Sequence, residues 1–177
     1  YANVEAKQEA LAAVRSNSFE IARATQDLEE PPTCYICLEG GDGLVRECNC
    51  RGNTGFAHLE CLIQYAKTLT PQNSFSFRWH SCRNCRSSFT GTTRLALARE
   101  CWKTYCSEPE DDWRRMWALD TLVAPLSDEL YCYPEALRAA EAHLATLQKH
   151  FSHEDPTGDR VTAAKVKLIL CHTNLGR

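Results

Sequence analysis

Eleven cysteines stand out in this chain of 177 residues, and seven of them fall in one stretch with regular spacing. A histidine lies among them where an eighth member of the pattern would be expected. The pattern reads Cys34-x2-Cys37, ten residues, Cys48-x-Cys50, seven residues, His58-x2-Cys61, twenty residues and Cys82-x2-Cys85. Thiolate sulfur and imidazole nitrogen are metal ligands, so these four close pairs are enough for two sites of four ligands each.

Disulfide bonds are the alternative use of so many cysteines. A secreted disulfide scaffold pairs its thiols in a small domain that follows a secretory signal. The first residues of this chain lack the apolar core of such a signal. Close C-x2-C pairs instead favour zinc thiolates in a reducing compartment. We therefore expect two structural Zn²⁺ ions without an open coordination position, in a protein of the cytoplasm or the nucleus.

The ligand order of four cysteines, one histidine and three cysteines resembles that of the RING-CH (RING-variant) zinc finger, found in membrane-associated RING-CH ubiquitin ligases. The segments CYICLE at 34–39, CNCRG at 48–52 and HLECL at 58–62 carry the resemblance, which covers about a third of the chain. It implies a cross-brace, in which successive pairs alternate between two ions. The first ion would take Cys34, Cys37, His58 and Cys61, and the second Cys48, Cys50, Cys82 and Cys85.

Two alternatives compete with the RING-CH interpretation of this segment. PHD fingers, which usually read histone tails, share the ligand order, but they usually separate the third and fourth cysteines further and place fewer residues before the histidine. His80 is a rival ligand near the last pair. Because the eight ligands of the pattern already fill both sites, we expect His80 to be a surface or packing residue.

The resemblance implies a ubiquitin ligase that forms no covalent intermediate. Domains of RING type bind a ubiquitin-charged conjugating enzyme and restrict the orientation of its thioester. We predict no covalent catalytic residue in this chain, because its best-placed cysteines are metal ligands. The positions that match contacts with the conjugating enzyme in the family are Ile36, Tyr65, Arg83 and Arg86.

Each of these four positions has a structural alternative or a departure from the family. Ile36 would pack either on the conjugating enzyme or in the small core of the finger. Arg86 would bridge conjugating enzyme and ubiquitin, or donate to the thiolates of the second site. Tyr65 and Arg83 stand where RING sequences commonly have tryptophan and proline, which keeps open a zinc-dependent interaction module without ligase activity. The arginines near the second site are Arg46, Arg51, Arg83 and Arg86.

The sequence divides into three parts that would position these residues. Residues 1–30 predict a helical extension and linker, and residues 31–90 predict the finger, with a short helix after His58 and a short strand at 77–79. Residues 91–177 predict a helical region. The expected fold is therefore a small α+β RING-CH cross-brace stapled by zinc, followed by an all-α region of helical hairpins.

In the helical region, apolar residues recur at helical spacing in four stretches. The expected helix starts are Thr92 or Thr93 as a cap, a capping box at Ser107-Glu108-Pro109-Glu110, Pro134, and Asp159. Pro125 is expected to kink or end the second helix.

This region also resembles tetratricopeptide repeats in their longer, kinesin-light-chain-like form. Residues 126–132 and 171–177 are similar at an offset of 45 residues, and residues 133–137 resemble the start of a second helix. Such repeats would recruit a protein substrate and would bury Trp113 and Trp117 in their core. An ordinary helical extension that packs on the finger is the alternative.

The composition argues against two further classes of function. The formal net charge is −3, from 20 basic and 23 acidic residues, without the block of like charge that nucleic-acid binding favours. The longest apolar runs are a handful of residues, far short of the roughly 20 that span a bilayer. We therefore expect no nucleic-acid partner and no membrane span in this chain. It begins at Tyr1 and ends within an expected helix, which suggests a fragment.

Overall fold

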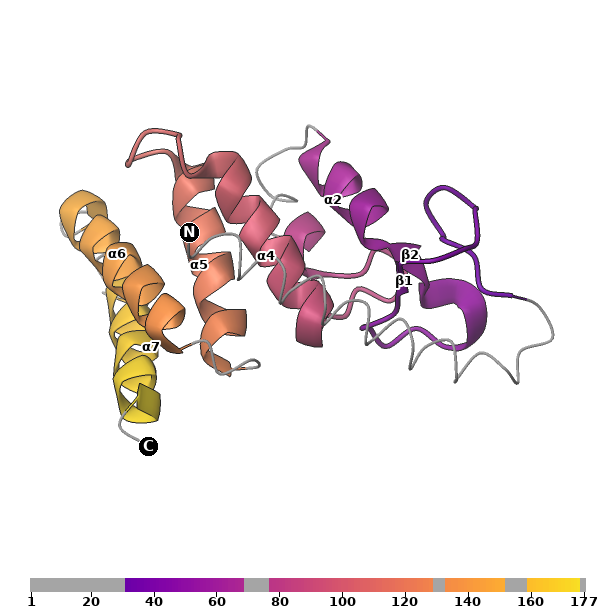
Figure 1. Cartoon of the computed structure of the whole chain (residues 1–177). Helices are drawn as coiled ribbons and strands as arrows, with labels where there is room; N and C mark the ends of the chain where they lie inside the picture. Colours follow the sequence, from indigo (N-terminus) through magenta and orange to yellow (C-terminus); the bar gives the residue numbers. More distant parts are fainter. Residues whose placement is uncertain (1–30, 69–76, 129–132, 152–158, 176–177) are drawn as a thin grey trace. The chain divides into compact units, whose positions relative to one another are not determined.

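The computed structural model describes residues 31–68, 77–128, 133–151 and 159–175 (Figure 1). The predicted helix within residues 1–30 lies outside the described residues. The chain divides into two compact units, Tyr1–Leu97 and Ala98–Arg177, and the division falls within helix α4 (Gly91–Tyr105). We refer to them as the first unit, which contains the finger, and the helical unit.

The first unit has little regular structure. Its elements before α4 are strand β1 (Leu44–Val45), the 3-10 helix η1 (Gly52–Gly55), strand β2 (Ala57–His58) and helix α2 (Leu59–Lys67). The two strands form an antiparallel sheet in which Leu44 pairs with His58. Because α2 follows β2 without a break, His58 ends the strand and stands directly before the helix. The predicted short helix after His58 is confirmed.

A small apolar core holds the first unit together. Its buried members are Cys34, Leu44, Val45, Phe56, Ala57, Leu62, Ile63, Cys82, Phe89 and Leu97. Two of these are cysteines of the ligand pattern, so metal binding and core packing involve the same side chains. A core of this size supplies little hydrophobic stabilisation, and a structural metal is the usual supplement.

The predicted strand at 77–79 is wrong. Residues 77–80 form a turn of helix, in which the N–H of Ser81 donates to the carbonyl of Phe77 at 2.9 Å. Three residues are too few to distinguish the two periodicities, and the neighbouring structure decides the conformation. Trp79 is fully buried, so its predicted role in core packing is confirmed.

Helix α4 begins at Gly91, but its predicted threonine cap is wrong. The Glu47 carboxylate accepts the backbone N–H of Thr93 at 2.5 Å and the hydroxyl of Thr92 at 3.2 Å. Gly91 has a φ of +53°, and a Cβ there would lie 2.8 Å from Oε1 of Glu47. The first turn of α4 is therefore capped by a side chain distant in sequence, and the left-handed φ of Gly91 favours glycine there.

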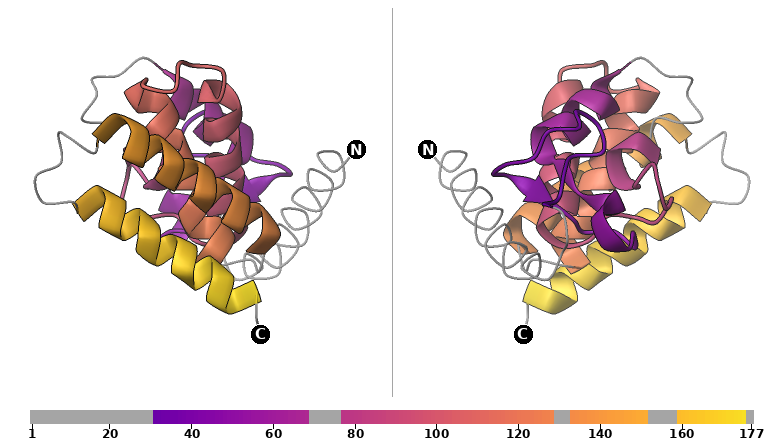
Figure 2. Two further views of the ribbon diagram at one scale, coloured as in Figure 1. Left: turned by 90° about the vertical axis from the view of Figure 1, so that its left-hand side faces the viewer. Right: turned by 90° about the vertical axis from the view of Figure 1, so that its right-hand side faces the viewer.

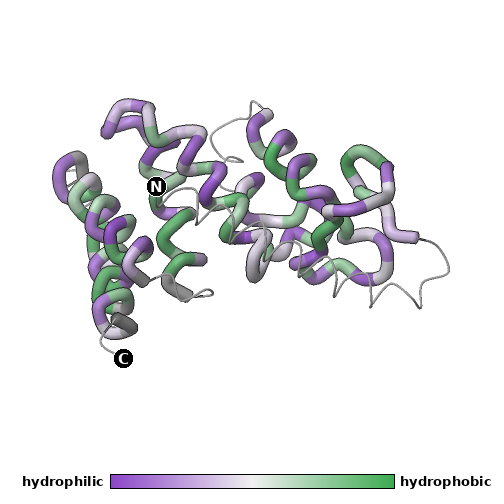
Figure 3. The backbone as a smooth tube through the Cα atoms, viewed as in Figure 1, coloured by the Kyte–Doolittle hydropathy of each residue, from purple (hydrophilic) through white to green (hydrophobic). Residues whose placement is uncertain are grey.

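The helical unit contains helices α5 (Trp113–Asp128), α6 (Tyr133–Phe151) and α7 (Asp159–Leu175). The α6 helix packs against both α5 and α7, and α5 also contacts α7 (Figure 2). Apolar and polar residues alternate along all three helices, as amphipathic helices require (Figure 3). The predicted starts of α6 and α7 are confirmed. Among the described residues, no helix is long and apolar enough to cross a bilayer.

Helix α5 begins later than its predicted capping box and continues beyond its predicted end. Asp112 caps it, because its Oδ1 accepts the N–H of Arg114 at 2.8 Å. Residues before Asp112 form a turn, with the N–H of Asp112 donating to the carbonyl of Pro109 at 3.0 Å. Pro125 does not end the helix, which runs to Asp128, and its ring is fully buried in the helical unit. That burial offsets the hydrogen bond that proline cannot make.

Candidate metal centres

Two of the C-x2-C pairs lie in turns of the same geometry, 34–39 and 82–87. In each turn, the residue after the second cysteine donates its N–H to the carbonyl of the first cysteine at 2.8 Å. That residue, Leu38 in one turn and Arg86 in the other, has a left-handed φ of 66° or 59°. Such a tight turn carries both sulfurs of a pair on one side of the chain, as a shared metal requires.

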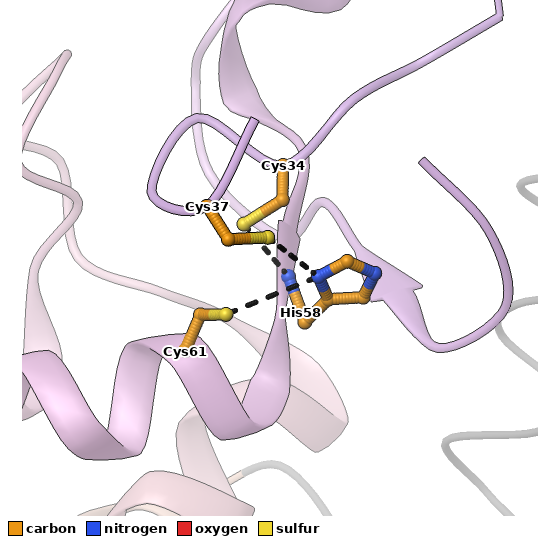
Figure 4. A group of neighbouring side chains, drawn as sticks. All are labelled: Cys34, Cys37, His58 and Cys61. Carbon is orange, nitrogen blue, oxygen red and sulfur yellow. Dashed lines mark hydrogen bonds between the residues drawn. The ribbon is translucent and has the colours of Figure 1, made fainter. Parts of the chain in front are cut away.

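The first cluster joins turn 34–39 to the junction of β2 and α2. Its members are Cys34, Cys37, His58 and Cys61. Figure 4 shows the three sulfurs and the imidazole pointing toward one another. Nδ1 of His58 lies 3.3 Å from Sγ of Cys37 and 3.9 Å from Sγ of Cys61. Ligands of a tetrahedral zinc with these donor types are about 3.3–3.8 Å apart, so Nδ1 and the three sulfurs fit one Zn²⁺.

Backbone N–H groups favour the thiolate form of Cys34. The N–H groups of Ile36 and His58 each lie 3.4 Å from its sulfur. Burial raises the pKa of this thiol, but the N–H groups of Cys37, His58 and Ile36 outweigh burial and lower the pKa to about 7. Burial and the nearby thiols of Cys37 and Cys34 raise the pKa of Cys61 to about 12. A cation bound in the cluster would counteract the burial and the neighbouring thiols that raise the pKa of Cys61.

The second cluster joins turn 82–87 to the segment before η1. Its members are Cys48, Cys50, Cys82 and Cys85. The sulfurs of Cys50 and Cys82 are 3.8 Å apart, again the separation expected of two zinc ligands. Burial raises the pKa of Cys48. Burial also raises the pKa of Cys85, but the hydroxyl and N–H of Ser87 outweigh it and lower the pKa to about 6.

Both clusters fit structural zinc. Within each cluster all four donor atoms lie within 4.8 Å of one another, and the donors are the sulfur and nitrogen atoms that Zn²⁺ prefers. Four protein ligands leave no coordination position for water. The pairs alternate between the clusters, so the predicted cross-brace is confirmed. His80 belongs to neither cluster, and its Nδ1 lies 2.6 Å from the hydroxyl of Ser81.

Two residues that the sequence reasoning missed shape the second cluster. The hydroxyl of Ser87 lies 3.0 Å from the sulfur of Cys85 and also accepts the N–H of Asn49 at 3.0 Å, which links the two halves of the site. A Cβ on Gly55 would lie 2.4 Å from Cβ of Cys50, so only glycine fits there. Ser87 follows the ligand Cys85 by two residues, and this proximity could have indicated that its hydroxyl reaches the sulfur. Nothing in the sequence indicates that Gly55 lies against a ligand.

The arginines near the second cluster have other contacts. Arg46 donates to the carbonyl of Gly52 at 2.8 Å and lies over the ring of Phe56, 5.1 Å from its centroid. Arg83 lies over the ring of Tyr65, 5.5 Å from the centroid. Apart from contacts among the ligands themselves, sulfurs of the two clusters receive hydrogen bonds from the backbone N–H groups of Ile36 and His58 and lie beside the hydroxyl of Ser87. The guanidinium groups of Arg46 and Arg83 are thus engaged away from the thiols.

The four predicted contact residues for a conjugating enzyme have different surroundings. Ile36 is half-buried and packs against the core of the first unit, whereas its neighbour Leu38 is 76% exposed. Arg86 is exposed at the end of turn 82–87. The structure brings Arg83 and Tyr65 together through the cation–π contact. Leu38 was missed by the sequence reasoning, although it directly follows a ligand.

Fold and ligand geometry define a RING-variant domain, and residues 34–85 match that family. This match favours the RING-CH interpretation over the PHD alternative. The chain is also 24% identical over 139 residues to the E3 ubiquitin-protein ligase LAP of Myxoma virus (strain Lausanne), which covers 78% of this chain and 64% of that protein. The chain therefore spans about 64% of the length of this curated relative. No solved structure matches the chain. The resemblance to tetratricopeptide repeats stays a prediction.

Proposed function

We propose that this protein is a ubiquitin ligase of RING type, in which the RING-variant domain binds a ubiquitin-charged conjugating enzyme and the helical region binds the substrate. The observation that supports this proposal most strongly is the pair of four-ligand clusters in a RING-variant domain. Because protein atoms fill every ligand position, the zinc ions stabilise a surface and do no chemistry themselves. The ligase name of the viral relative supports the same class. Thiolates that must stay reduced favour the cytoplasm or the nucleus.

On this proposal the chain contributes binding and orientation. Ile36 and Tyr65 offer apolar surface to the conjugating enzyme, and the exposed guanidinium of Arg86 donates hydrogen bonds to conjugating enzyme and ubiquitin. The left-handed backbone at Arg86, fixed by turn 82–87, sets the direction in which its side chain leaves the domain. Restricting the thioester to one orientation accelerates its attack by an amine without any acid or base from the ligase.

A zinc-dependent interaction module without ligase activity is the second candidate. The stacking of Arg83 on Tyr65 favours it, because it places a guanidinium on the surface where an apolar contact with a conjugating enzyme is expected. Arg78 lies over the same ring at 4.7 Å from its centroid and adds a second positive charge. Desolvating two guanidinium groups opposes the docking of an apolar partner surface.

Discharge of ubiquitin separates the two candidates. The rate of ubiquitin release from a panel of charged conjugating enzymes onto free lysine is measured with wild type, Ile36→Ala and Arg86→Ala. We expect acceleration by wild type and a loss of about tenfold or more in each variant, the size of one charge-assisted hydrogen bond or one buried apolar contact. Ile169→Ala and Arg138→Ala, at exposed positions of α7 and α6, are the matched controls and keep the wild-type rate.

Zinc content is measured on every sample, because a misfolded domain would also lack activity. If wild type carries two zinc ions per chain and accelerates discharge from none of the enzymes, the ligase proposal is wrong and the interaction module stands. If both control variants lose as much activity as Ile36→Ala and Arg86→Ala, the assigned contact surface is wrong.

A further inference from the structure

The helical unit has a pocket to which the proposed transfer step gives no role. It lies among α5, α6 and α7 and has a volume of about 230 Å³. Pockets that hold drug-sized molecules are larger, roughly 300–1,000 Å³. The space suits a single large side chain of a protein partner.

The wall of the pocket is apolar. Met116 and Trp117 line it from α5, Leu147 lines it from α6, and two alanines of α7 leave the open space. Trp117 is 45% exposed, so the prediction that it lies in a repeat core is wrong. An indole face and a thioether are both good neighbours for an aromatic ring, through stacking and sulfur–aromatic contact.

One edge of the pocket is polar and is centred on Asp120. Its Oδ1 accepts Nζ of Lys167 at 2.5 Å and lies 3.7 Å from Nδ1 of His143. Every contact that the described part of the chain makes with this carboxylate is to Oδ1, so Oδ2 remains available as an acceptor.

His143 adds a buried polar group to this edge. It lines the pocket, only 6% of its surface is exposed, and Nδ1 has no hydrogen-bond partner among the described residues. Burial lowers the pKa of His143, Asp120 on α5 opposes this effect, and Lys167 on α7 reinforces it. The polar edge therefore consists of a neutral imidazole and a balanced ion pair with one free acceptor oxygen.

A matching ligand is uncharged, aromatic and able to donate one hydrogen bond. A charged ligand would meet an ion pair whose charges already cancel, and a purely aliphatic one would form no hydrogen bond with the free oxygen of Asp120. We propose that the pocket binds a tyrosine side chain of a protein partner, with its ring against Trp117 and Met116 and its hydroxyl donated to Asp120. The role of this pocket as a substrate site rests on the proposed function. The binding of a tyrosine side chain in the pocket does not depend on that function.

The single methionine of the chain provides a direct probe. Met116 lines the pocket, so labelling methionine with ¹³C at the methyl group gives one NMR signal that reports on it. The full chain with zinc is titrated with N-acetyltyrosinamide, N-acetylphenylalaninamide and N-acetylleucinamide. We expect a saturable shift with the tyrosine compound, about tenfold tighter binding than with the phenylalanine compound, and weaker binding still with leucine.

Two substitutions test the location of the site. Ala163→Leu fills the pocket and abolishes the shift, whereas Ala145→Leu, the same change at an exposed position of α6, leaves it unchanged. Asp120→Asn removes the charge of the acceptor and lowers the preference for tyrosine over phenylalanine severalfold. The amide spectrum of each variant shows whether it has kept its fold.

The proposal is overturned by the absence of a saturable shift with the tyrosine compound, by equal affinity for phenylalanine, or by unchanged binding in a folded Ala163→Leu variant. The discharge assay gives an independent answer. Tyrosine binding without ubiquitin discharge would overturn the ligase proposal and keep the pocket, and discharge without tyrosine binding would do the reverse.

Discussion

Strands β1 and β2 of the first unit have two residues each, whereas helices α5, α6 and α7 of the helical unit have 16, 19 and 17. Elements as short as those strands cannot hold a fold by their own hydrogen bonds. The first unit instead gathers eight ligand side chains at two points. The helical unit buries continuous apolar stripes between neighbouring helices. One unit is thus fixed by a few strong bonds at defined positions, and the other by many weak contacts that tolerate change.

Removal of metal should have the largest effect, and it should affect the first unit and not the helical unit. A chelator is expected to unfold the first unit, because structural zinc contributes on the order of 10 kcal/mol to the folding of such small domains. The helical unit should keep its helices. Circular dichroism at 222 nm and amide NMR spectra, recorded with and without chelator, check this. Loss of the entire helical signal would show that the helical unit also depends on metal, contrary to the contrast drawn between the two units.

Replacing one cysteine in each unit by serine sharpens the comparison with the same chemical change. Cys48→Ser should reduce the zinc content from two ions per chain and unfold the first unit. Cys101→Ser, at a fully buried position of the helical unit, should cost only about 1–3 kcal/mol for burying a hydroxyl, with zinc content unchanged. Metal analysis and urea denaturation measure the two results. Equal zinc loss in both variants would be incompatible with the two assignments.

Shortening a side chain in the core of the helical unit should lower the stability of that unit without changing the zinc content. Leu126 is fully buried in α5, so Leu126→Ala should destabilise the helical unit by about 2–5 kcal/mol. Ile169→Ala, at a position of α7 that is 62% exposed, is the control and should change the stability by less than about 0.5 kcal/mol. Urea denaturation followed at 222 nm gives both values. A fall in zinc content of Leu126→Ala would show that the units do not fold separately.

The smallest expected effect is at the cap of α5. Asp112→Ala should cost about 1 kcal/mol at neutral pH, while Asp111→Ala at the exposed neighbouring position should cost much less. The hydrogen bond from Arg114 lowers the pKa of Asp112 below its value in the unfolded chain. The contribution is therefore present above the unfolded pKa of about 3.9 and is lost as pH falls through the lower folded pKa. Denaturation at neutral and acidic pH should show the difference closing, and a constant difference would contradict it.

The ligand set could be predicted from the sequence because its geometry is local. A gap of two residues between cysteines specifies turns such as 34–39 and 82–87. The assignment of the four ligand pairs to two ions came from the resemblance to the RING-CH finger, whose cross-brace the two clusters match. The starts of α6 and α7 were equally predictable, since each opens a long stretch of helical periodicity.

Most of the wrong predictions from sequence concern places where contacts distant in sequence decide the local structure. The Glu47 cap of α4 and the burial of Pro125 each depend on neighbours that the local sequence does not reveal. Trp117 was misplaced for the same reason, because helical spacing gives a face but does not say whether small residues opposite leave that face open. The helical turn at 77–80 was missed because three residues are too few to show a period.

The Glu47 cap has a practical consequence for dividing the chain into fragments. Glu47 directly precedes the ligand Cys48, and its carboxylate accepts the first N–H groups of a helix that runs on into the helical unit. A recombinant fragment that starts at Gly91 would lack this acceptor and leave those N–H groups to water. The side-chain oxygen of a serine or aspartate added just before the helix would replace the missing acceptor, so the cut can be made there without loss of the first turn.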